Sequence, residues 1–351
     1  MARFNLSGIG LRGVAAAVPA QREDNAALDA LPESRRQELI RTTGIRYRHI
    51  AREDQCASDL CVAAAERLLQ ELSWAPDSID VLVMVTQTPD HPLPGPASHV
   101  QHRLGLRTST VVLDINHGCA GYVYGLSVIG SLMAASGLKK GLLLVGDTIT
   151  RTIADSDYSL RPIFSDSGSA TALEWDPEAG SMAFLMGTSG QEYEAIYIPH
   201  GGARHPLTEA SLHPETVTSS VTRHAGQLAM KGQDVFTFGL TRIAPEIKQL
   251  LEDTGTEPDA VDHLVLHQAN QLLLDAIGRK AGMRPEQVPS SLYDYGNTSS
   301  ATIPVTMCHR LGTALENQHQ RLLLSGFGVG LSWGSVLLET PPLACPAIIT
   351  L

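Results

Sequence analysis

Three nearly continuous apolar runs, separated by helical patterns, constrain the fold of this chain most strongly. The runs lie at residues 79–85, 110–113 and 142–145. Runs of this kind are typical of strands that are covered on both faces. Helical patterns occupy residues 57–72, 96–104 and 119–136. The alternation of strands and helices predicts an α/β fold with a largely parallel sheet.

The second half of the chain repeats this pattern. VDHLVL at 261–266 resembles IDVLVM at 79–84, and RLLLS at 321–325 resembles GLLLV at 141–145. Similar intervals separate the two members of each pair, which predicts a duplicated unit of about 180 residues. We therefore expect two halves, residues 1–178 and 179–351, with the joint in the region 175–195.

Residues 118–138 carry no charge and are long enough to span a bilayer. The segment contains five glycines and three serines and lies between two strand-like runs, so we expect a buried helix instead of a membrane span. The first ten residues, MARFNLSGIG, lack the long apolar core of a signal peptide. The five cysteines, which lack the spacing of a zinc site or a disulfide framework, favour a reducing, cytoplasmic setting.

Composition excludes several classes of protein. Hydrophobic residues make up 43% of the chain and charged residues 18%, which excludes a disordered chain. The net charge of −11 argues against a general nucleic-acid binder. The five cysteines have no CxxC spacing, so we expect neither a disulfide framework nor a zinc site. They are Cys56, Cys61, Cys119, Cys308 and Cys345.

Cys119 is the first candidate for chemistry. It stands in DINHGCAGY, where a strand ends near Asn116 and the uncharged helix is expected to begin at Cys119. The dipole at a helix N-terminus favours the thiolate form of a cysteine. The small residues around Cys119 leave room for a substrate to reach the sulfur. An inert buried cysteine is the alternative interpretation.

His267 and Asn297 are further candidates. His267 begins HQAN directly after an expected buried strand, and open α/β sheets place their sites at such strand ends. Asn297 stands in YGNTSSAT, where small polar residues suit a tightly packed helix start that projects the amide into a site. A core histidine bonded to backbone and an ordinary Gly-Asn turn are the alternatives.

The segment GFGVGLSWG at 326–334 follows another expected strand. It is not a dinucleotide fingerprint, because no helix follows, and the chain has no GxxxxGK[ST] phosphate loop. Its free backbone N–H groups suit an oxyanion hole. His99 with His102, and His117 with Cys119, lack companion ligands at suitable spacing, so we expect no metal. Residues 201–224, rich in Thr, Ser, Pro and His, are either a solvated loop or a cap over a substrate site.

Together, these motifs resemble the β-ketoacyl-acyl-carrier-protein synthase III family of the thiolase superfamily. The matching elements, in order, are the Cys-Ala-Gly elbow, His-Gln-Ala-Asn, Gly-Asn-Thr-Ser and the terminal Gly-Phe-Gly-x-Gly-x-x-Trp-Gly; TGIRYRHIA at 43–51 resembles an early family signature. The resemblance implies a five-layered αβαβα fold of two duplicated halves, usually as a homodimer. The N-terminal half would carry the nucleophile, and the C-terminal half would carry the histidine and the asparagine.

The resemblance also implies the activity. Cys119 would accept an acyl group from acyl-CoA or an acyl carrier protein (acyl-ACP), with the backbone N–H groups of Cys119 and Val329 as the oxyanion hole. His267 and Asn297 would then stabilise the enolate formed when malonyl-ACP or malonyl-CoA loses CO2, and no cofactor is implied. The expected function is a decarboxylative Claisen condensation in specialised lipid or secondary-metabolite synthesis. Expected substrate contacts are Asn270, Phe327, Gly328 and Leu93.

Other activities remain open at this stage. The same cysteine would serve a non-decarboxylating acyltransferase or a hydrolase, and the chain is alternatively a non-catalytic partner subunit of a heterodimeric synthase. Loss of one of the three catalytic residue types is common in such subunits, and this chain retains all three. Chalcone-synthase-like enzymes share the three residue types but end in a different glycine-rich pattern.

Several positions depart from the family pattern. Leu272 stands where the family uses an arginine for the carrier protein, and Glu38, Thr42 and Tyr158 stand where it holds CoA. Leu93 replaces a phenylalanine that lines the partner subunit's acyl pocket, which predicts room for a longer acyl chain. The basic residues expected either as a carrier-protein patch or as ordinary solvated surface are Arg41, Arg46, Arg48, Arg52, Lys139 and Lys140.

Overall fold

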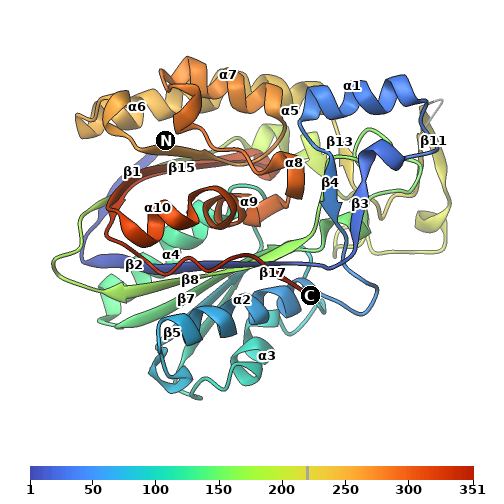
Figure 1. Cartoon of the computed structure of the whole chain (residues 1–351). Helices are drawn as coiled ribbons and strands as arrows, with labels where there is room; N and C mark the ends of the chain where they lie inside the picture. Colours follow the sequence, from blue (N-terminus) through green and yellow to red (C-terminus); the bar gives the residue numbers. More distant parts are fainter. Residues whose placement is uncertain (219–220) are drawn as a thin grey trace.

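The chain forms two stacked β-sheets, with helices between them and on both outer faces (Figure 1). The structure, a computed structural model, describes residues 1–218 and 221–351. The six-stranded sheet contains, in spatial order, β17 (Ile349–Thr350), β2 (Ile9–Val18), β8 (Ser167–Trp175), β7 (Lys140–Asp147), β5 (Val81–Val85) and β6 (Val111–Ile115). The five-stranded sheet contains β1 (Ala2–Leu6), β9 (Met182–Thr188), β16 (Ser332–Thr340), β15 (Gln320–Gly328) and β14 (His263–Leu266).

The helices form three layers around these sheets, which gives the expected αβαβα order. The central layer contains α4 (Gly121–Ser136), α9 (Thr302–Thr306) and α10 (Gly312–Asn317). The outer layer on the six-stranded sheet contains α2 (Ala57–Glu71) and α3 (Pro96–Arg103). The other outer layer contains α6 (Ala244–Thr254) and α7 (Gln271–Ala281), with α5 (Gly232–Phe238) beside it. Two further helices are α1 (Glu33–Thr43) and α8 (Leu292–Tyr295).

The uncharged segment is the central helix α4, and its glycines explain how it fits between two sheets. A Cβ added to Gly125 would lie 2.7 Å from Leu143 of the six-stranded sheet. A Cβ added to Gly130 would lie 2.9 Å from Leu6 of the five-stranded sheet. Both sheets therefore approach the helix backbone more closely than any side chain would allow. Within the described residues, no helix has the length and apolar character needed to cross a membrane.

The two sheets share one topology. In the first, β2 is antiparallel to β8, β8 to β7, and β7 is parallel to β5. In the second, β9, β16, β15 and β14 repeat this order and these directions. The central helices also correspond, because α4 precedes β7 and α9–α10 precede β15. The strand pairs β5/β14 and β7/β15 contain the sequence repeats noted above.

The chain passes from one sheet to the other between β8 and β9. The terminal strands cross back, because β1 pairs with β9 and β17 pairs with β2. Each sheet therefore contains a strand from the opposite end of the chain. We keep the division at 178/179 as a proposal for the two halves.

Short ribbons complete the fold near the upper right of Figure 1. They are β3 (Arg22–Asp24) with β4 (Tyr47–His49), β10 (Ile196–Tyr197) with β13 (Ala229–Met230), and β11 (Glu215–Thr218) with β12 (Val221–Arg223). The segment expected as a loop or cap thus contains the β11–β12 ribbon, and its residues 219–220 lie outside the described part. Its role as a cap stays a prediction.

Candidate active site

Cys119 lies in the turn between β6 and α4. Its side chain is buried, with 6% relative exposure. The helix begins at Gly121, with Ala120 as its N-cap, two residues later than the sequence pattern predicts. The backbone N–H groups of Val329 and Cys119 hydrogen-bond to the sulfur. These are the two groups expected to form the oxyanion hole, and both point to the thiol.

The glycine-rich turn after β15 packs directly against Cys119. Gly328 has a φ of +156°, and a Cβ there would lie 2.7 Å from the Cys119 sulfur. A Cβ on Gly326 would lie 2.8 Å from Ala120 Cα. Glycine is therefore required for the backbone to come close enough to present the Val329 N–H to the thiol.

His267 lies directly beyond the end of β14 and is almost fully buried. Its Nδ1 is 2.8 Å from Thr302 Oγ1, and its ring meets Phe327 edge to face at 5.4 Å. Burial lowers the pKa of His267 to about 3, so its imidazole is neutral. Thr302 Oγ1 also donates to the Ser299 carbonyl at 3.2 Å, in which case Nδ1 is the donor and Nε2 is an acceptor.

Asn297 is held by its backbone and by its carboxamide oxygen. Its N–H donates to the Ile163 carbonyl at 2.9 Å, and its own carbonyl accepts from Ser165 N–H at 2.9 Å. The carboxamide Oδ1 accepts from Ser299 N–H at 2.9 Å. This arrangement leaves the amide N–H groups of Asn297 available to a ligand.

Cys119, His267 and Asn297 line one cavity of about 310 Å³. The sequence predicts them in three distant segments, and the structure brings them together. Asn270, Phe327 and Gly328 line the same cavity. Most of its remaining wall is apolar: Leu160, Ile163, Phe164, Ile196, Met230, Val235, Phe236 and Leu273.

Leu93 is the exception among the expected substrate contacts. It does not line the cavity of its own chain and is 82% exposed. Its role in the acyl pocket of a partner subunit stays a prediction.

A second pocket, of about 460 Å³, adjoins this cavity, because Ser159 and Ile163 line both. Helix α1 forms one wall, where Arg35 and Glu38 make an ion pair of 2.9 Å. Glu38, Thr42 and Tyr158, the positions at which the chain departs from the family's CoA contacts, all line this pocket.

Burial changes the expectation for the thiol. It raises the pKa of Cys119 to about 11, and the hydrogen bonds from Val329, Cys119 and Ser299 only partly oppose it. The expected thiolate at the helix N-terminus is therefore replaced by a neutral thiol beside a neutral imidazole. The thiol must lose its proton as it attacks a substrate.

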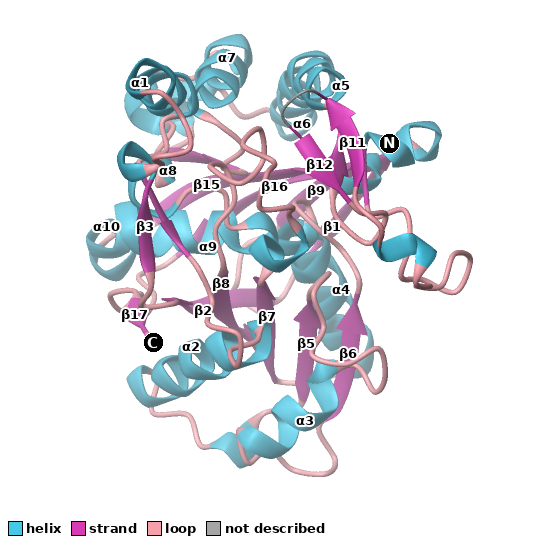
Figure 2. Cartoon of the chain, turned by 90° about the vertical axis from the view of Figure 1, so that its right-hand side faces the viewer, coloured by secondary structure: helices cyan, strands magenta, loops and turns pink. Residues whose placement is uncertain are grey.

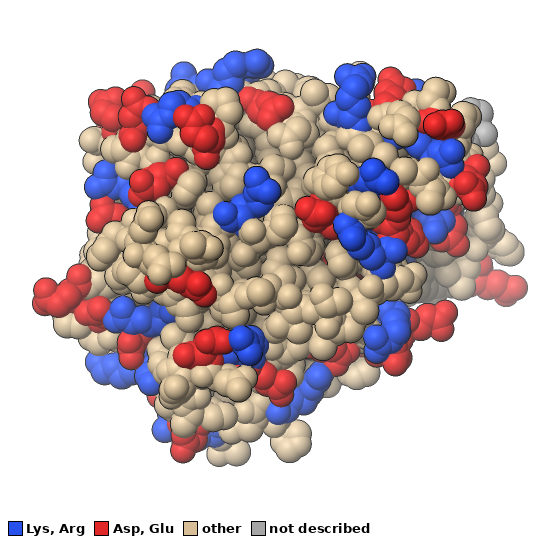
Figure 3. All heavy atoms as spheres, viewed as in Figure 1, with Lys and Arg blue, Asp and Glu red and all other residues tan. Residues whose placement is uncertain are grey.

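The basic residues considered as a carrier-protein patch are dispersed. Arg48 is buried and paired with Glu23, while Arg46 pairs with Asp24. The two lysines lie over the rings of two tryptophans, Lys139 over Trp175 and Lys140 over Trp74. Figure 3 shows acidic and basic side chains intermixed on the face it displays. Arg48 therefore belongs to neither interpretation, and the other residues named here fit ordinary surface better than a continuous patch.

Sequence reasoning missed Asp147, Ser299, Ser300 and Thr302 as parts of the site. Asp147 Oδ2 accepts from Ser300 Oγ at 2.5 Å. These two residues are 153 positions apart, and no local pattern marks the aspartate. The backbone of Ser299 does mark it as unusual in the structure, because its φ of +53° is rare for a residue other than glycine.

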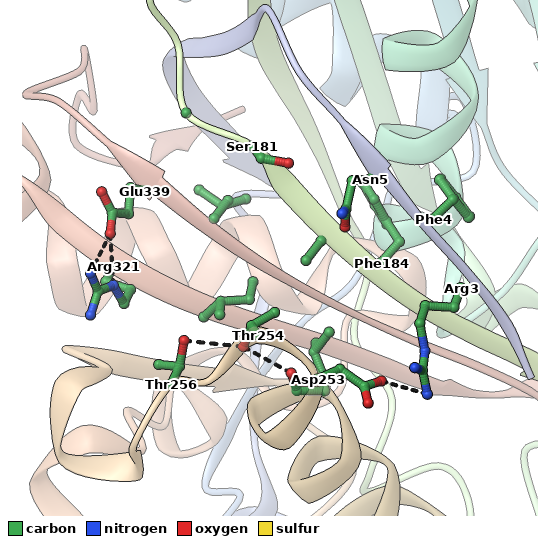
Figure 4. A pocket seen from close by; sticks show the side chains of 15 residues that line it. Arg3, Phe4, Asn5, Ser181, Phe184, Asp253, Thr254, Thr256, Arg321 and Glu339 are labelled. Atoms are coloured by element: carbon green, nitrogen blue, oxygen red, sulfur yellow. Dashed lines mark hydrogen bonds and ion pairs between the residues drawn. The ribbon is translucent and has the colours of Figure 1, made fainter.

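A groove of about 690 Å³, drawn in Figure 4, shares no lining residue with the active-site cavity. Its charged side chains pair with one another, Arg3 with Asp253 at 2.6 Å and Arg321 with Glu339 at 2.5 Å. Among the described residues, no cluster of three or more His, Cys, Asp or Glu side chains is arranged to hold a metal ion.

Comparison with known proteins agrees with this architecture. The family model for 3-oxoacyl-[acyl-carrier-protein] synthase III matches residues 113–190, and the model for its C-terminal domain matches residues 251–340. A solved 3-oxoacyl-(acyl-carrier-protein) synthase from Burkholderia xenovorans LB400 superposes with a TM-score of 0.94 at 33% identity, over 100% of this chain and 99% of that one. The priming β-ketosynthase of the R1128 polyketide pathway shares the fold, with a TM-score of 0.84 at 24% identity over 97% of this chain and 98% of that one.

The curated relatives extend over the same length. The β-ketoacyl-[acyl-carrier-protein] synthase III of Streptococcus pneumoniae (strain Hungary19A-6) is 31% identical over 327 residues, which is 93% of this chain and 97% of that protein. The chain therefore belongs to the β-ketoacyl-[acyl-carrier-protein] synthase III family, whose members are condensing acyltransferases with the thiolase fold.

Proposed function

We propose that Cys119 takes an acyl group from an acyl thioester and that His267 and Asn297 then support its decarboxylative condensation with a malonyl thioester. The observation that carries this proposal is the shared cavity, which all three side chains line and which adjoins a second pocket beside α1. The cavity also presents two backbone donors to the thiol, which is the arrangement that acyl transfer requires.

In the first half-reaction, the Cys119 sulfur attacks the thioester carbonyl carbon. The thiol proton moves to Nε2 of His267, which is free to accept it while Nδ1–H donates to Thr302. The oxyanion lies against the N–H groups of Cys119 and Val329, each of which contributes on the order of 3 kcal/mol in comparable sites. The tetrahedral intermediate collapses, the donor thiol leaves with the proton, and the acyl group stays on Cys119.

In the second half-reaction, a malonyl thioester loses CO2 and leaves an enolate. The enolate oxygen accepts hydrogen bonds from the Asn297 amide and from Nε2–H of His267. This tautomer forms between the half-reactions, when water gives a proton to Nε2 and takes the one from Nδ1, after which the Thr302 hydroxyl donates to Nδ1. A neutral imidazole is a weak acid, so it stabilises the enolate without protonating its carbon. That carbon attacks the acyl carbonyl, a carbon–carbon bond forms, and the Cys119 thioester breaks to release the β-ketoacyl thioester.

The substrates proposed are acyl-CoA or acyl-ACP as donor and malonyl-ACP or malonyl-CoA as extender. The surface pocket beside α1 suits the long thioester arm that CoA and a carrier protein share. Glu38 and Tyr158 in this pocket differ from the family's CoA contacts, which supports a specialised lipid or secondary-metabolite pathway. Leu272, exposed on α7, leaves the carrier-protein contact without the family's arginine.

A homodimer is part of this proposal. Strand β6 lies at one edge of the six-stranded sheet (Figure 2), where Val111 and Leu113 are 43% and 40% exposed. An apolar edge strand of this kind favours pairing with another chain. Leu93 would then reach the cavity of the partner subunit. The five cysteines are all free thiols, which supports a reducing, cytoplasmic setting.

The test is intact-protein mass spectrometry after mixing with acyl-CoAs from acetyl to long-chain, with Cys119→Ala as control. We expect a chain-length-selective adduct that is absent from C119A and that malonyl thioester discharges with release of CO2. Carrier-bound donors are tested in the same way where CoA donors give no adduct. An adduct that malonyl-CoA and malonyl-ACP both leave intact indicates a non-decarboxylating acyltransferase, and absence of any adduct indicates a non-catalytic partner subunit.

A further inference from the structure

Asp147, at the end of β7, is a fully buried carboxylate held by donors from two separate segments. Oδ1 accepts from Gln87 N–H at 2.7 Å and from Thr86 Oγ1 at 3.2 Å. Oδ2 accepts from Ser300 Oγ at 2.5 Å and from Ser300 N–H at 3.3 Å. A buried carboxylate keeps such partners because each one lost leaves a desolvated charge less well satisfied.

The two segments bound by Asp147 lie on either side of the nucleophile. A Cβ added to Gly118 would lie 2.3 Å from the carboxamide oxygen of Gln87. A Cβ added to Gly121 would lie 3.3 Å from Ser300 Cβ. Gln87 therefore packs against the residue before Cys119, and Ser300 packs against the first residue of α4.

The segment that contains Ser300 also carries Asn297. Ser299 connects them in a left-handed conformation, and its N–H holds the Asn297 carboxamide oxygen. Its hydroxyl hydrogen-bonds to the Cys119 thiol and to Asp147. Serine adopts this conformation at a cost, so its neighbours must hold it there. The bonds from Ser300 to Asp147 are the adjacent anchor.

We propose that Asp147 is a positioning residue that fixes Asn297 relative to Cys119 through Ser300. Asp147 affects condensation more than acyl loading. Loading uses the thiol and two backbone N–H groups, whereas condensation also needs the Asn297 amide at a fixed position relative to the acyl group. The proposal rests on the proposed roles of Cys119 and Asn297.

Ser300→Ala tests this most directly, with Ser335→Ala as a matched control. Both serines are fully buried and donate to a buried carboxylate, Ser300 to Asp147 at 2.5 Å and Ser335 to Glu246 at 2.8 Å. For S300A we expect loading within about threefold of wild type. We expect the condensation kcat to fall roughly tenfold or more, with KM for the malonyl thioester within about twofold. S335A should change neither step.

Asp147→Asn provides a second variant, compared with Glu246→Gln. The amide of D147N has one acceptor oxygen where the carboxylate has two, so it cannot hold both segments. We expect a larger loss of condensation, accompanied by slower loading because the bond to Gln87 N–H is also weakened. The proposal is overturned if S300A loses acyl loading and condensation to the same extent, or if it condenses at the wild-type rate. It is also overturned if S335A loses as much condensation activity as S300A. Thermal unfolding of each variant separates a loss of folding from a loss of positioning.

Asn297→Ala in the same assay keeps the two proposals distinct. If the proposed function is right, N297A loads the acyl group and fails to condense it. Wild-type condensation by N297A contradicts the proposed catalytic role itself, whatever the result for S300A.

Discussion

Glu246 on α6 predicts a pH dependence of stability that one substitution should remove. Its side chain is 1% exposed, its Oε2 accepts from Ser335 Oγ, and its Oε1 is buried with no hydrogen-bond partner. Burial raises the pKa of Glu246 from 4.5 to about 8. The folded chain therefore holds a proton that the unfolded chain releases above pH 4.5.

The sign follows from this difference. Protonated Glu246 stabilises the fold fully below pH 4.5, and the contribution is lost as pH rises through about 8. A glutamine of the same shape has no proton to lose. The advantage of Glu246→Gln over wild type should therefore grow by about 3 kcal/mol between pH 5 and pH 8.

Urea unfolding of wild type and E246Q at pH 5, 6, 7 and 8, followed by circular dichroism, measures this change. Ser335→Ala is the companion variant, because it removes the hydroxyl hydrogen bond that lowers the pKa of Glu246. Its pH-dependent loss of stability should therefore extend to higher pH than that of wild type. A constant difference between wild type and E246Q across this range would refute the reasoning, since it would mean that Glu246 has an ordinary pKa in the fold.

Three further predictions concern the site. Gly328→Ala should abolish acyl loading, because the added Cβ would lie 2.7 Å from the Cys119 sulfur, whereas Gly202→Ala, which adds a Cβ in open space, should load normally. Intact-protein mass measures both variants, and an acyl adduct on G328A would contradict the close packing of Gly328 against Cys119. Iodoacetamide should modify Cys119 slowly at pH 7, and the rate should rise about tenfold per pH unit up to pH 9, because the raised pKa of Cys119 keeps the thiol protonated over this range. Peptide mass spectrometry measures the rate, and a rate that stops rising below pH 8 would contradict the prediction. Leu93→Phe should shift acyl loading toward shorter chains. If wild type loads acetyl best and loading falls steadily with acyl chain length, Leu93 makes no extra room for a longer chain.

The sequence predicts the inner strands well and the sheet edges poorly. Strands β5 and β7 are long apolar runs because both of their faces are buried, so their composition alone identifies them. Strands β1 and β17 are short and partly exposed, and each pairs with a strand from the opposite end of the chain. Their partners depend on the assembled fold, which no local pattern encodes.

The candidate site divides in the same way. Cys119, His267 and Asn297 stand in motifs that mark strand ends and helix starts, so the sequence alone identifies each of them as a candidate. The protonation state of Cys119 was not predictable, because a helix start favours thiolate locally, whereas the burial that opposes it comes from the whole fold. Asp147 was missed for a related reason, since its partner Ser300 lies in the other repeat.

The repeated topology also relates the thiol and the amide of the site by an approximate symmetry. Cys119 lies directly before α4 and Asn297 directly before the turn that leads into α9, so the two residues occupy corresponding places in the two repeats. A symmetric pair of identical ancestral chains carries the same residue at both places, because any mutation appears in each copy. Fusion into one chain removes that constraint. In this chain one repeat carries a thiol at that place and the other carries an amide, so two chemically different groups of one cavity come from matching segments.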